Sequence, residues 1–297
     1  MGYLLALRPH QWVKNIFVLA ALVFSKRFME GSTYVLDALQ MVFAFSLAAS
    51  SIYLVNDISD YERDRVHPKK RLRPIASGRI SRVGAGILAL CVAPISWWLS
   101  WDLDPACLWV ILVYTVMNLG YSFKLKHVVL LDVFIIALGF LLRVTAGAFA
   151  IKAKVSPWLI LCTFFVALFL AFCKRRNELV SLGDAAASHR GILASYSVVF
   201  IDKMVSALAS LTIMSYALYT IDPGVVKRLE TDGLILTLPV VLFGVFRYLF
   251  LVHQKQKGGS PTEVMLKDRS IQLIGILYLG ISIASIYFKW NLGLGQN

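Results

Sequence analysis

Long apolar stretches recur from one end of this sequence to the other. A membrane-spanning helix needs about 20 mostly apolar residues. Nine stretches of this kind lie near residues 12–28, 35–56, 81–100, 106–122, 130–151, 157–173, 203–221, 233–252 and 271–288. Of the 297 residues, 58% are hydrophobic and 16% are charged, and the mean hydropathy is +0.71, far above that of water-soluble domains. We therefore expect an all-α, polytopic integral membrane protein with about nine transmembrane helices in a single domain over residues 1–297.

The first stretch differs from the others because it contains polar residues. If its helix begins at Trp12, Lys14 and Asn15 lie inside the span. A charged side chain within a membrane helix is costly and usually faces a cavity. Alternatively, the helix begins later and Lys14 only extends its ammonium group to the membrane surface.

The positions of the basic residues predict the orientation of the chain. Most of the 30 Lys and Arg residues lie before the first stretch or in the four even-numbered loops, near residues 57–82, 124–126, 174–203 and 255–269. Cytoplasmic loops carry such an excess, so we expect a plasma (inner) membrane protein with its N-terminus and active site in the cytoplasm and its C-terminus outside. The net charge of +13 indicates anionic lipids or substrates. It does not indicate nucleic acid, because the bases are scattered and no nucleic-acid-binding motif accompanies them.

A strongly charged segment, NDISDYERDRVHPKKRLRP at residues 56–74, follows the second apolar stretch. If the second helix continues into it, Asp57, Asp60 and Asp64 fall within an arc of roughly 60°, and Glu62 lies on the far side. Crowded carboxylates repel one another unless a cation lies between them. Carboxylate oxygens suit Mg²⁺, which proteins often hold with one or two carboxylates and substrate phosphates. The alternative is a solvated, salt-bridged cytoplasmic loop.

A basic run, Lys69 to Arg73, follows these acids within a few helical turns. A departing diphosphate needs a metal ion to neutralise its charge and basic side chains to hold its remaining oxygens. Arg is well suited to bidentate phosphate contacts. The order of acids and then bases therefore predicts a site for Mg²⁺ and a diphosphate, with Lys70, Arg71 and Arg73 as phosphate-binding residues.

Six motifs resemble a known family. The pattern NDxxDxxxD at the end of the second stretch resembles the first signature of the UbiA superfamily of intramembrane prenyltransferases. Five other motifs resemble its decaprenyl-phosphate phosphoribosyltransferase branch: RPHQWVKN (8–15), HPKKRLRPIASG (67–78), YSFKLK (121–126), CKRRNEL (173–179) and GGSPTEVMLKDR (258–269). The resemblance covers nearly the whole chain. It implies a helical bundle whose cavity opens to the cytoplasm and sideways to lipid.

The same resemblance implies an activity and a set of ligands. The activity is Mg²⁺-dependent transfer of 5-phosphoribose from phosphoribosyl diphosphate to a polyprenyl phosphate, with release of diphosphate. The implied metal ligands are Asn56, Asp57, Asp60 and Asp64, of which the three aspartates are the expected catalytic residues. The expected substrate-binding residues are Lys14, Asn15, Lys70, Arg71, Arg73, Tyr121, Lys124, Lys126, Arg143, Lys174, Arg175, Glu178 and Tyr196.

One motif departs from the wider family. Typical members have a second acidic motif, DxxxD, after the sixth helix, and it helps to bind a second metal ion. This chain has Lys174, Arg175, Arg176, Asn177 and Glu178 there. On a helix, Lys174, Asn177 and Glu178 share a face about 100° wide, with Arg175 on its flank. One carboxylate among bases suits direct pairing with phosphate, and the alternative is a basic anchor that contacts only lipid headgroups.

Some of the other candidate residues have two interpretations. Asp132 and Arg143 are about 20° out of phase on the fifth helix, so both can face one cavity. There, Arg143 either binds phosphate or has a structural role, paired with a buried group. Tyr121 and Tyr196 either orient substrate or anchor helix ends at the membrane interface.

Two other functions stay open on the sequence alone. A prenyltransferase of the same superfamily would move an isoprenoid from its diphosphate to an aromatic or other acceptor, but the basic residues at the second motif argue against it. A non-enzymatic transporter or lipid-binding protein is expected to have a polar midplane with broken helices, whereas the polar residues here gather at cytoplasmic ends. The sequence also leaves room for a homo-oligomer.

Overall fold

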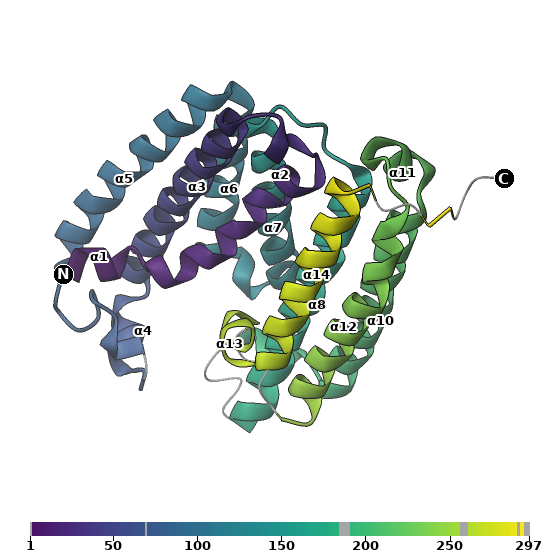
Figure 1. Cartoon of the computed structure of the whole chain (residues 1–297). Helices are drawn as coiled ribbons and strands as arrows, with labels where there is room; N and C mark the ends of the chain where they lie inside the picture. Colours follow the sequence, from purple (N-terminus) through teal and green to yellow (C-terminus); the bar gives the residue numbers. More distant parts are fainter. Residues whose placement is uncertain (1, 69, 184–190, 256–260, 290–291, 294–297) are drawn as a thin grey trace. The chain divides into compact units, whose positions relative to one another are not determined.

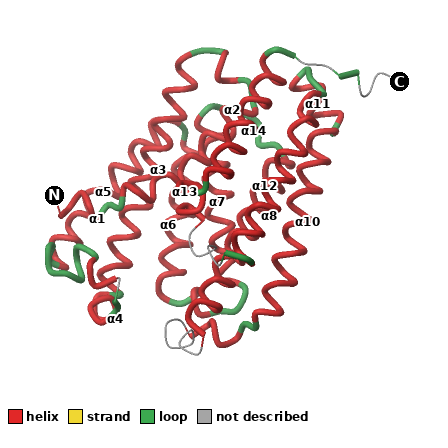
Figure 2. The backbone as a smooth tube through the Cα atoms, turned by 60° about the horizontal axis from the view of Figure 1, so that its bottom comes forward, coloured by secondary structure: helices red, strands yellow, loops and turns green. Residues whose placement is uncertain are grey.

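The computed structural model describes residues 2–68, 70–183, 191–255, 261–289 and 292–293, and every regular element in these ranges is helical (Figures 1 and 2). Eight helices of this described part are long and apolar enough to cross a membrane. They are α3 (Ser32–Ser59), α5 (Arg82–Leu103), α6 (Pro105–Phe123), α7 (Leu131–Ala150), α8 (Pro157–Leu182), α10 (Val198–Ile221), α12 (Leu238–His253), which follows the 3₁₀ helix η7 (Gly233–Thr237), and α14 (Arg269–Tyr287). The predicted all-helical membrane architecture is confirmed.

The first predicted span is built differently from these eight. After the short helix α1 (Gly2–Ala6), a 3₁₀ helix η1 (Pro9–Leu19) continues into the α-helix α2 (Ala20–Phe24). A 3₁₀ helix rises about 2.0 Å per residue and an α-helix about 1.5 Å, so the composite segment extends roughly 30 Å. That length equals the hydrocarbon thickness of a bilayer. Because the segment is not one continuous α-helix, the count of nine spans stays a prediction.

The chain forms two compact units, which we describe separately. Unit 1 comprises Met1–Lys126 and Leu141–Val155, and unit 2 comprises His127–Phe140 and Ser156–Asn297. Helix α7 contributes its first half to unit 2 and its second half to unit 1. The single domain expected over residues 1–297 stays a prediction.

Unit 1 is organised around α3, which packs along α5 and α6. Its core contains Phe45, Ile111 and Tyr114. Small residues let the segments approach closely, as membrane helices commonly do. A Cβ atom added to Gly147 would lie 1.8 Å from the carbonyl oxygen of Val18. Glycine is therefore required where the second half of α7 crosses η1.

The two ends of unit 1 have different surfaces. Where α5 ends and α6 begins, the rings of Trp98, Trp101 and Trp109 are exposed. At the opposite end of α3 lie the charged helix α4 (Tyr61–Val66) and the 3₁₀ helix η3 (Lys70–Leu72), which pack against each other. Exposed tryptophans are typical of the membrane–water interface, so the Trp end and the α4 end of unit 1 correspond to the two membrane surfaces.

Unit 2 contains α8, α10, α12 and α14 side by side (Figure 1). A cluster including Phe169, Phe172, Ile201 and Leu251 fills its core. The short helix α11 (Pro223–Leu229) lies at one end of this unit, and α13 (Pro261–Lys267) lies at the other (Figure 1). Arg175, Glu178 and Tyr196, which the sequence predicts to bind substrate, belong to this unit.

Candidate functional site

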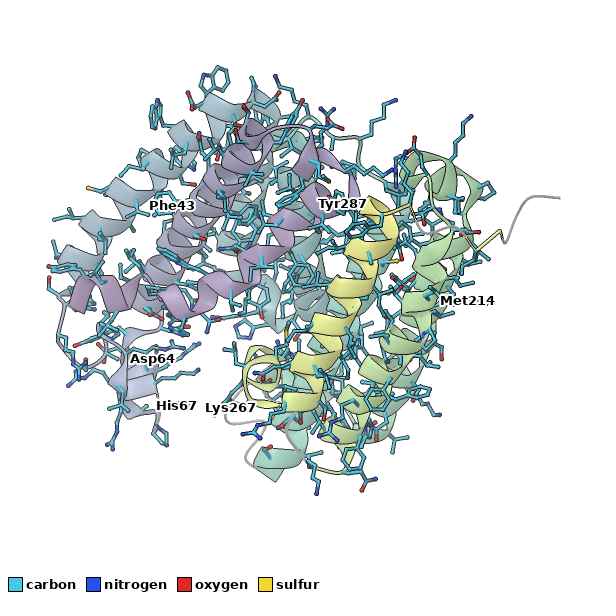
Figure 3. All side chains as sticks on the ribbon, in the orientation of Figure 1. Phe43, Asp64, His67, Met214, Lys267 and Tyr287 are labelled. Carbon is cyan, nitrogen blue, oxygen red and sulfur yellow. The ribbon has the colours of Figure 1, made fainter. Side chains whose placement is uncertain are left out.

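The acidic segment keeps helical hydrogen bonding across the junction between α3 and α4. Asp60 adopts φ −90° and ψ 9°, outside either helix. Its amide still donates to the carbonyl of Asn56 over 2.9 Å, and the amide of Asp64 donates to the carbonyl of Asp60 over 2.9 Å. The predicted common face is therefore preserved: Asp57 and Asp64 are buried, Asp60 is half-buried and Glu62 is exposed. Figure 3 shows Asp64 on α4, with His67 just beyond it.

Asp57 and Asp64 form the carboxylate pair of unit 1. Arg8 Nη2 donates to both carboxylate oxygens of Asp57, over 2.5 and 2.7 Å. Arg73 Nη1 donates to Asp57 Oδ1 over 3.0 Å and to Asp64 Oδ2 over 2.5 Å. One guanidinium nitrogen thus bridges the two carboxylates at the position that a shared cation would take.

Arg8 was missed as a site residue by the sequence analysis. Its backbone is in the left-handed region, with φ 54°, which costs an L-residue about 1–3 kcal/mol. The contacts that offset this cost are the ion pair with Asp57 and the placement of the guanidinium 5.0 Å from the centre of the Tyr53 ring. The available signal was its position as the first residue of the RPHQWVKN motif, directly before the first apolar stretch.

Asp60 has a different partner from the carboxylate pair. Its Oδ1 lies 3.5 Å from Lys126 Nζ, and both side chains are partly exposed. Among the described residues, no three His, Cys, Asp or Glu side chains are grouped so that they could hold a metal ion. The structure brings Asp57 and Asp64 together around one nitrogen of Arg73 and leaves Asp60 at the side. Two carboxylates still fit Mg²⁺, which commonly takes its other ligands from water and phosphate.

The other candidate residues of unit 1 lie in η3, at the end of α6 and in the last turns of α3. In η3, Lys70 is half-buried and Arg71 is exposed, and both follow the carboxylate pair along the chain. At the end of α6, Tyr121 is half-buried and Lys124 is exposed. Asn56 is half-buried in the last turns of α3. Lys69, and residues 258–260 of the last motif, lie outside the described residues.

A second polar group in unit 1 surrounds Arg143. Asn15 is buried: its amide donates to Ser46 Oγ over 2.8 Å, and its Oδ1 accepts a hydrogen bond from Arg143 Nε over 2.8 Å. Arg143 Nη2 donates to the Tyr114 hydroxyl over 3.0 Å. The guanidinium lies 4.9 Å from the centres of both the Phe45 and the Tyr114 ring. Asn15 therefore fixes Arg143, and both have protein partners.

In unit 2, Asp132, Arg175, Glu178 and Tyr196 form what we call the Arg175 network. Arg175 Nε donates to Asp132 Oδ2 over 2.7 Å, and Nη1 donates to Glu178 Oε2 over 2.5 Å. The Tyr196 hydroxyl donates to Asp132 Oδ1 over 3.0 Å and accepts from the amide of Leu130 over 2.7 Å. Burial raises the pKa of Tyr196 to about 12, so its hydroxyl stays protonated.

The Arg175 network differs from the phosphate site that its residues predicted. The side chains of Arg175 and Asp132 are 1% and 0% exposed, so their charges satisfy each other away from solvent. Lys174 is 43% exposed, and its Nζ lies 4.0 Å from Glu178 Oε1. Of the predicted residues in this segment that the structure describes, Lys174 is therefore the most exposed. Phosphate binding by Arg175, Glu178 and Tyr196 stays a prediction.

Comparison with known proteins places the chain among membrane transferases. The model of the UbiA prenyltransferase family matches residues 14–267. A protein of Mycolicibacterium smegmatis named decaprenyl-phosphate phosphoribosyltransferase is 35% identical over 301 residues, which cover 97% of this chain and 93% of that protein. A Mycobacterium tuberculosis protein of the same name is 33% identical over 292 residues, covering 97% and 95% of the two chains.

Solved structures share the fold at low sequence identity. A UbiA homolog from Archaeoglobus fulgidus bound to GPP and Mg²⁺ has a TM-score of 0.72 and 18% identity, covering 97% of this chain and 100% of that one. A UbiA homolog from Aeropyrum pernix without ligand has a TM-score of 0.66 and 15% identity, covering 94% and 98%. These structures support the fold and do not by themselves identify a substrate.

Proposed function

Because this chain belongs to the UbiA prenyltransferase family, we propose that it transfers 5-phosphoribose from phosphoribosyl diphosphate to a polyprenyl phosphate of the decaprenyl type. Diphosphate is released in the reaction. The observation that carries the proposal is the 35% identity, over 97% of the chain, to a protein named for this activity. The chain is accordingly an integral membrane transferase.

The carboxylate pair is the proposed site for Mg²⁺. Asp57 and Asp64 would hold the ion together with oxygens of the donor diphosphate. Asn56 and Asp60, which are close to them in sequence, are the other proposed metal ligands. Mg²⁺ bound there supplies positive charge that stabilises the departing diphosphate. The two carboxylates suit a shared cation because a positively charged group, Arg73 Nη1, already lies between Asp57 Oδ1 and Asp64 Oδ2.

Arg8 and Arg73, beside the carboxylate pair, are proposed to have two roles. In the structure, Arg8 and Arg73 neutralise buried carboxylates, which would otherwise be costly to desolvate. Their guanidinium groups are partly exposed and present N–H donors that match phosphate oxygens. We assign them, with Lys70 and Arg71 of η3, to the diphosphate of the donor.

The chemistry requires no base from the protein. The bond between C1 of ribose and the diphosphate oxygen breaks, which leaves an oxocarbenium-like ribose. An oxygen of the lipid phosphate then forms the new bond to C1. A phosphate monoester is already ionised at pH 7, because its second pKa is about 6. The acidic and basic residues of the site therefore only need to bind and orient the two substrates.

The two ends of unit 1 support a proposed placement in the membrane. The α4 end carries the carboxylate pair and the basic segment, and the other end carries exposed tryptophans. The excess of bases in the even-numbered loops supports a cytoplasmic position for the α4 end. A water-soluble donor would then reach the carboxylate pair from the cytoplasm, while the acceptor would arrive through the lipid.

The test uses the whole protein purified in detergent. It is mixed with Mg²⁺, a polyprenyl phosphate and radiolabelled phosphoribosyl diphosphate, and label in the organic extract is counted. We expect label to move into lipid and the transfer to stop when EDTA is added. No transfer, together with activity on a polyprenyl diphosphate and an aromatic acceptor, would contradict the proposal and favour an ordinary prenyltransferase.

A further inference from the structure

The chain turns at Arg8 between α1 and η1, and the backbone there opposes two local preferences. Arg8 has φ 54° and ψ 57°, in the left-handed region that L-residues rarely adopt. The next residue is Pro9, and a residue before proline favours an extended backbone. A conformation of this kind persists where surrounding contacts fix it. The same turn sets where η1 begins, and η1 carries the half-buried Lys14 and the buried Asn15.

Ser50 of α3 contacts the chain on both sides of Arg8. Its side chain is 0% exposed, and α1 and η1 both lie against α3 (Figure 1). The Ser50 hydroxyl donates to the carbonyl oxygen of Leu7 over 2.7 Å and accepts from Trp12 Nε1 over 3.1 Å. The carbonyl oxygen of Ser46, one turn earlier in α3, lies 2.8 Å away and shares the hydroxyl proton. One hydroxyl group therefore joins the residue before Arg8 and a residue of η1 to the same point of α3.

Ser50, Tyr53 and Asp57 share one face of α3. They are three and seven positions apart, which places them within an arc of roughly 60°. The Arg8 guanidinium lies 5.0 Å from the centre of the Tyr53 ring, and its Nη2 donates to both carboxylate oxygens of Asp57. At about 1.5 Å per residue, Ser50 and Asp57 are roughly 10 Å apart along the helix. This face of α3 thus holds the backbone around Arg8 at one point and its guanidinium at another.

We propose that Ser50 is a positioning residue for Arg8. By fixing the chain on both sides of Arg8, it keeps the guanidinium beside Asp57, where the N–H groups can bind a diphosphate. The role rests on the proposed function, which assigns Arg8 to the donor diphosphate. Ser50 acts through Arg8 and makes no contact with the ligand itself. Loss of its hydroxyl therefore releases the turn and moves the Arg8 guanidinium away from the diphosphate.

The experiment measures the binding of inorganic diphosphate with Mg²⁺ to the full-length protein in detergent, by calorimetry. Diphosphate is the probe because it is the leaving group both of phosphoribosyl transfer and of the alternative prenyl transfer. The proteins are the wild type, Ser50→Ala, Arg8→Gln, the double variant and Ser96→Ala. Ser96 is the matched control: it is also 0% exposed, and its hydroxyl on α5 donates to the carbonyl oxygen of Ala44 on α3 over 2.7 Å.

The proposal predicts a selective and non-additive loss of affinity. Ser50→Ala should weaken diphosphate binding about tenfold, the effect of losing a charged hydrogen bond, while Ser96→Ala binds as the wild type does. Adding Ser50→Ala to Arg8→Gln should change the affinity no further, because no guanidinium is left to position. Ser50→Thr keeps the hydroxyl and should restore most of the affinity.

Three results would overturn the proposal: equal affinities of Ser50→Ala and Ser96→Ala, effects of Ser50→Ala and Arg8→Gln that multiply, or no diphosphate binding by the wild type. Unfolding midpoints establish that the compared proteins are folded. If Ser50→Ala does not fold, Trp12→Phe takes its place in the same comparison, because it removes only the indole N–H that Ser50 accepts.

Transfer kinetics separate failure of this role from failure of the proposed function. Ser50→Ala should raise the KM for phosphoribosyl diphosphate and leave the KM for polyprenyl phosphate unchanged. A variant that had only lost stability would contain less active protein, so its kcat would fall with both KM values unchanged. With wild-type transfer intact, an unchanged donor KM removes the positioning role and leaves the function standing. If the wild type transfers no label but the diphosphate affinities follow the predicted pattern, the positioning role stands and the proposed reaction is wrong.

Discussion

The carboxylate pair of unit 1 and the Arg175 network of unit 2 both contain ion pairs between aspartate and arginine, but their arginines differ in exposure to solvent. In unit 1, the Asp57 and Asp64 side chains are 3% and 2% exposed, whereas those of Arg8 and Arg73 are 18% and 26% exposed. In unit 2, Arg175 and Asp132 are 1% and 0% exposed. Arginines that reach solvent can exchange a carboxylate for a phosphate, but a fully buried arginine cannot leave without stranding a charge. The first cluster is therefore suited to ligand binding and the second to holding helices together.

The largest effect should come from removing the charge of Asp57. We expect Asp57→Asn to lower phosphoribosyl transfer about 100- to 1,000-fold, because one of the two carboxylates proposed to hold the metal loses its charge. Glu62→Gln is the control, since Glu62 is an exposed carboxylate of the same segment, and its transfer rate should match the wild type. Near-normal turnover by Asp57→Asn would remove the carboxylate pair from the reaction.

The second prediction breaks the Arg175 network. Arg175→Met leaves Asp132 buried without its cation, and such a loss costs about 3–5 kcal/mol of folding stability. The double variant Arg175→Met/Asp132→Leu should recover much of this loss, because it leaves no buried charge. Unfolding midpoints in detergent measure both. If Arg175→Met destabilises the protein no more than Asp57→Asn does, the distinction between the two clusters is wrong.

These clusters show what periodicity can and cannot predict. The long apolar stretches predicted the positions of the eight long helices in the described part of the chain, and the helical repeat placed Asp57 and Asp64 on one buried face. The partners of these carboxylates were not predictable, since Arg8 is 49 positions from Asp57 in the chain. The role expected for Arg175 likewise did not include an ion pair with Asp132, 43 positions away. Local patterns determine which face a residue occupies, but the packing of distant segments determines what it contacts.

The first apolar stretch illustrates the same limit on a larger scale. Its composition predicted a helix across residues 12–28, but the structure contains η1 followed by α2, and Arg8 before them has a positive φ. The closeness of Gly147 to Val18 and the hydrogen bonds of Asn15 to Ser46 and Arg143 favour this backbone. All of these contacts come from segments that are remote in sequence.

The third prediction tests whether Arg73 exchanges partners. In Arg73→Gln, the carboxylate pair loses a competing cation, so the Mg²⁺ concentration for half-maximal rate should fall. The KM for phosphoribosyl diphosphate should rise about tenfold, because a charged hydrogen bond to phosphate is lost. Titrations of Mg²⁺ and donor against the transfer rate measure the two changes. A rise in both quantities would mean that Arg73 only holds the carboxylates in place.

The smallest effect belongs to the ion pair between Arg247 and Asp268, whose arginine and aspartate are each more exposed than those of either cluster. Arg247 Nη2 donates to Asp268 Oδ2 over 2.9 Å, and Asp268 Oδ1 accepts from the amide of Ile271 over 3.0 Å at the start of α14. The side chains are 31% and 17% exposed. Asn still caps a helix well, so Asp268→Asn should lose only the ion pair, about 0.5 kcal/mol at pH 7.

The pH dependence of this variant gives the sign of the effect. The hydrogen bond from Arg247 lowers the pKa of Asp268 below its ordinary value of 3.8. A carboxylate with a lowered pKa contributes stability that is present above its unfolded pKa and is lost as the pH falls through the folded one. The difference in unfolding midpoint between the wild type and Asp268→Asn should therefore be constant near neutrality and should disappear below pH 3.8. A difference that persists in acid would mean that the carboxylate stabilises α14 through its shape and not through its charge, which would separate this pair from both arginine clusters.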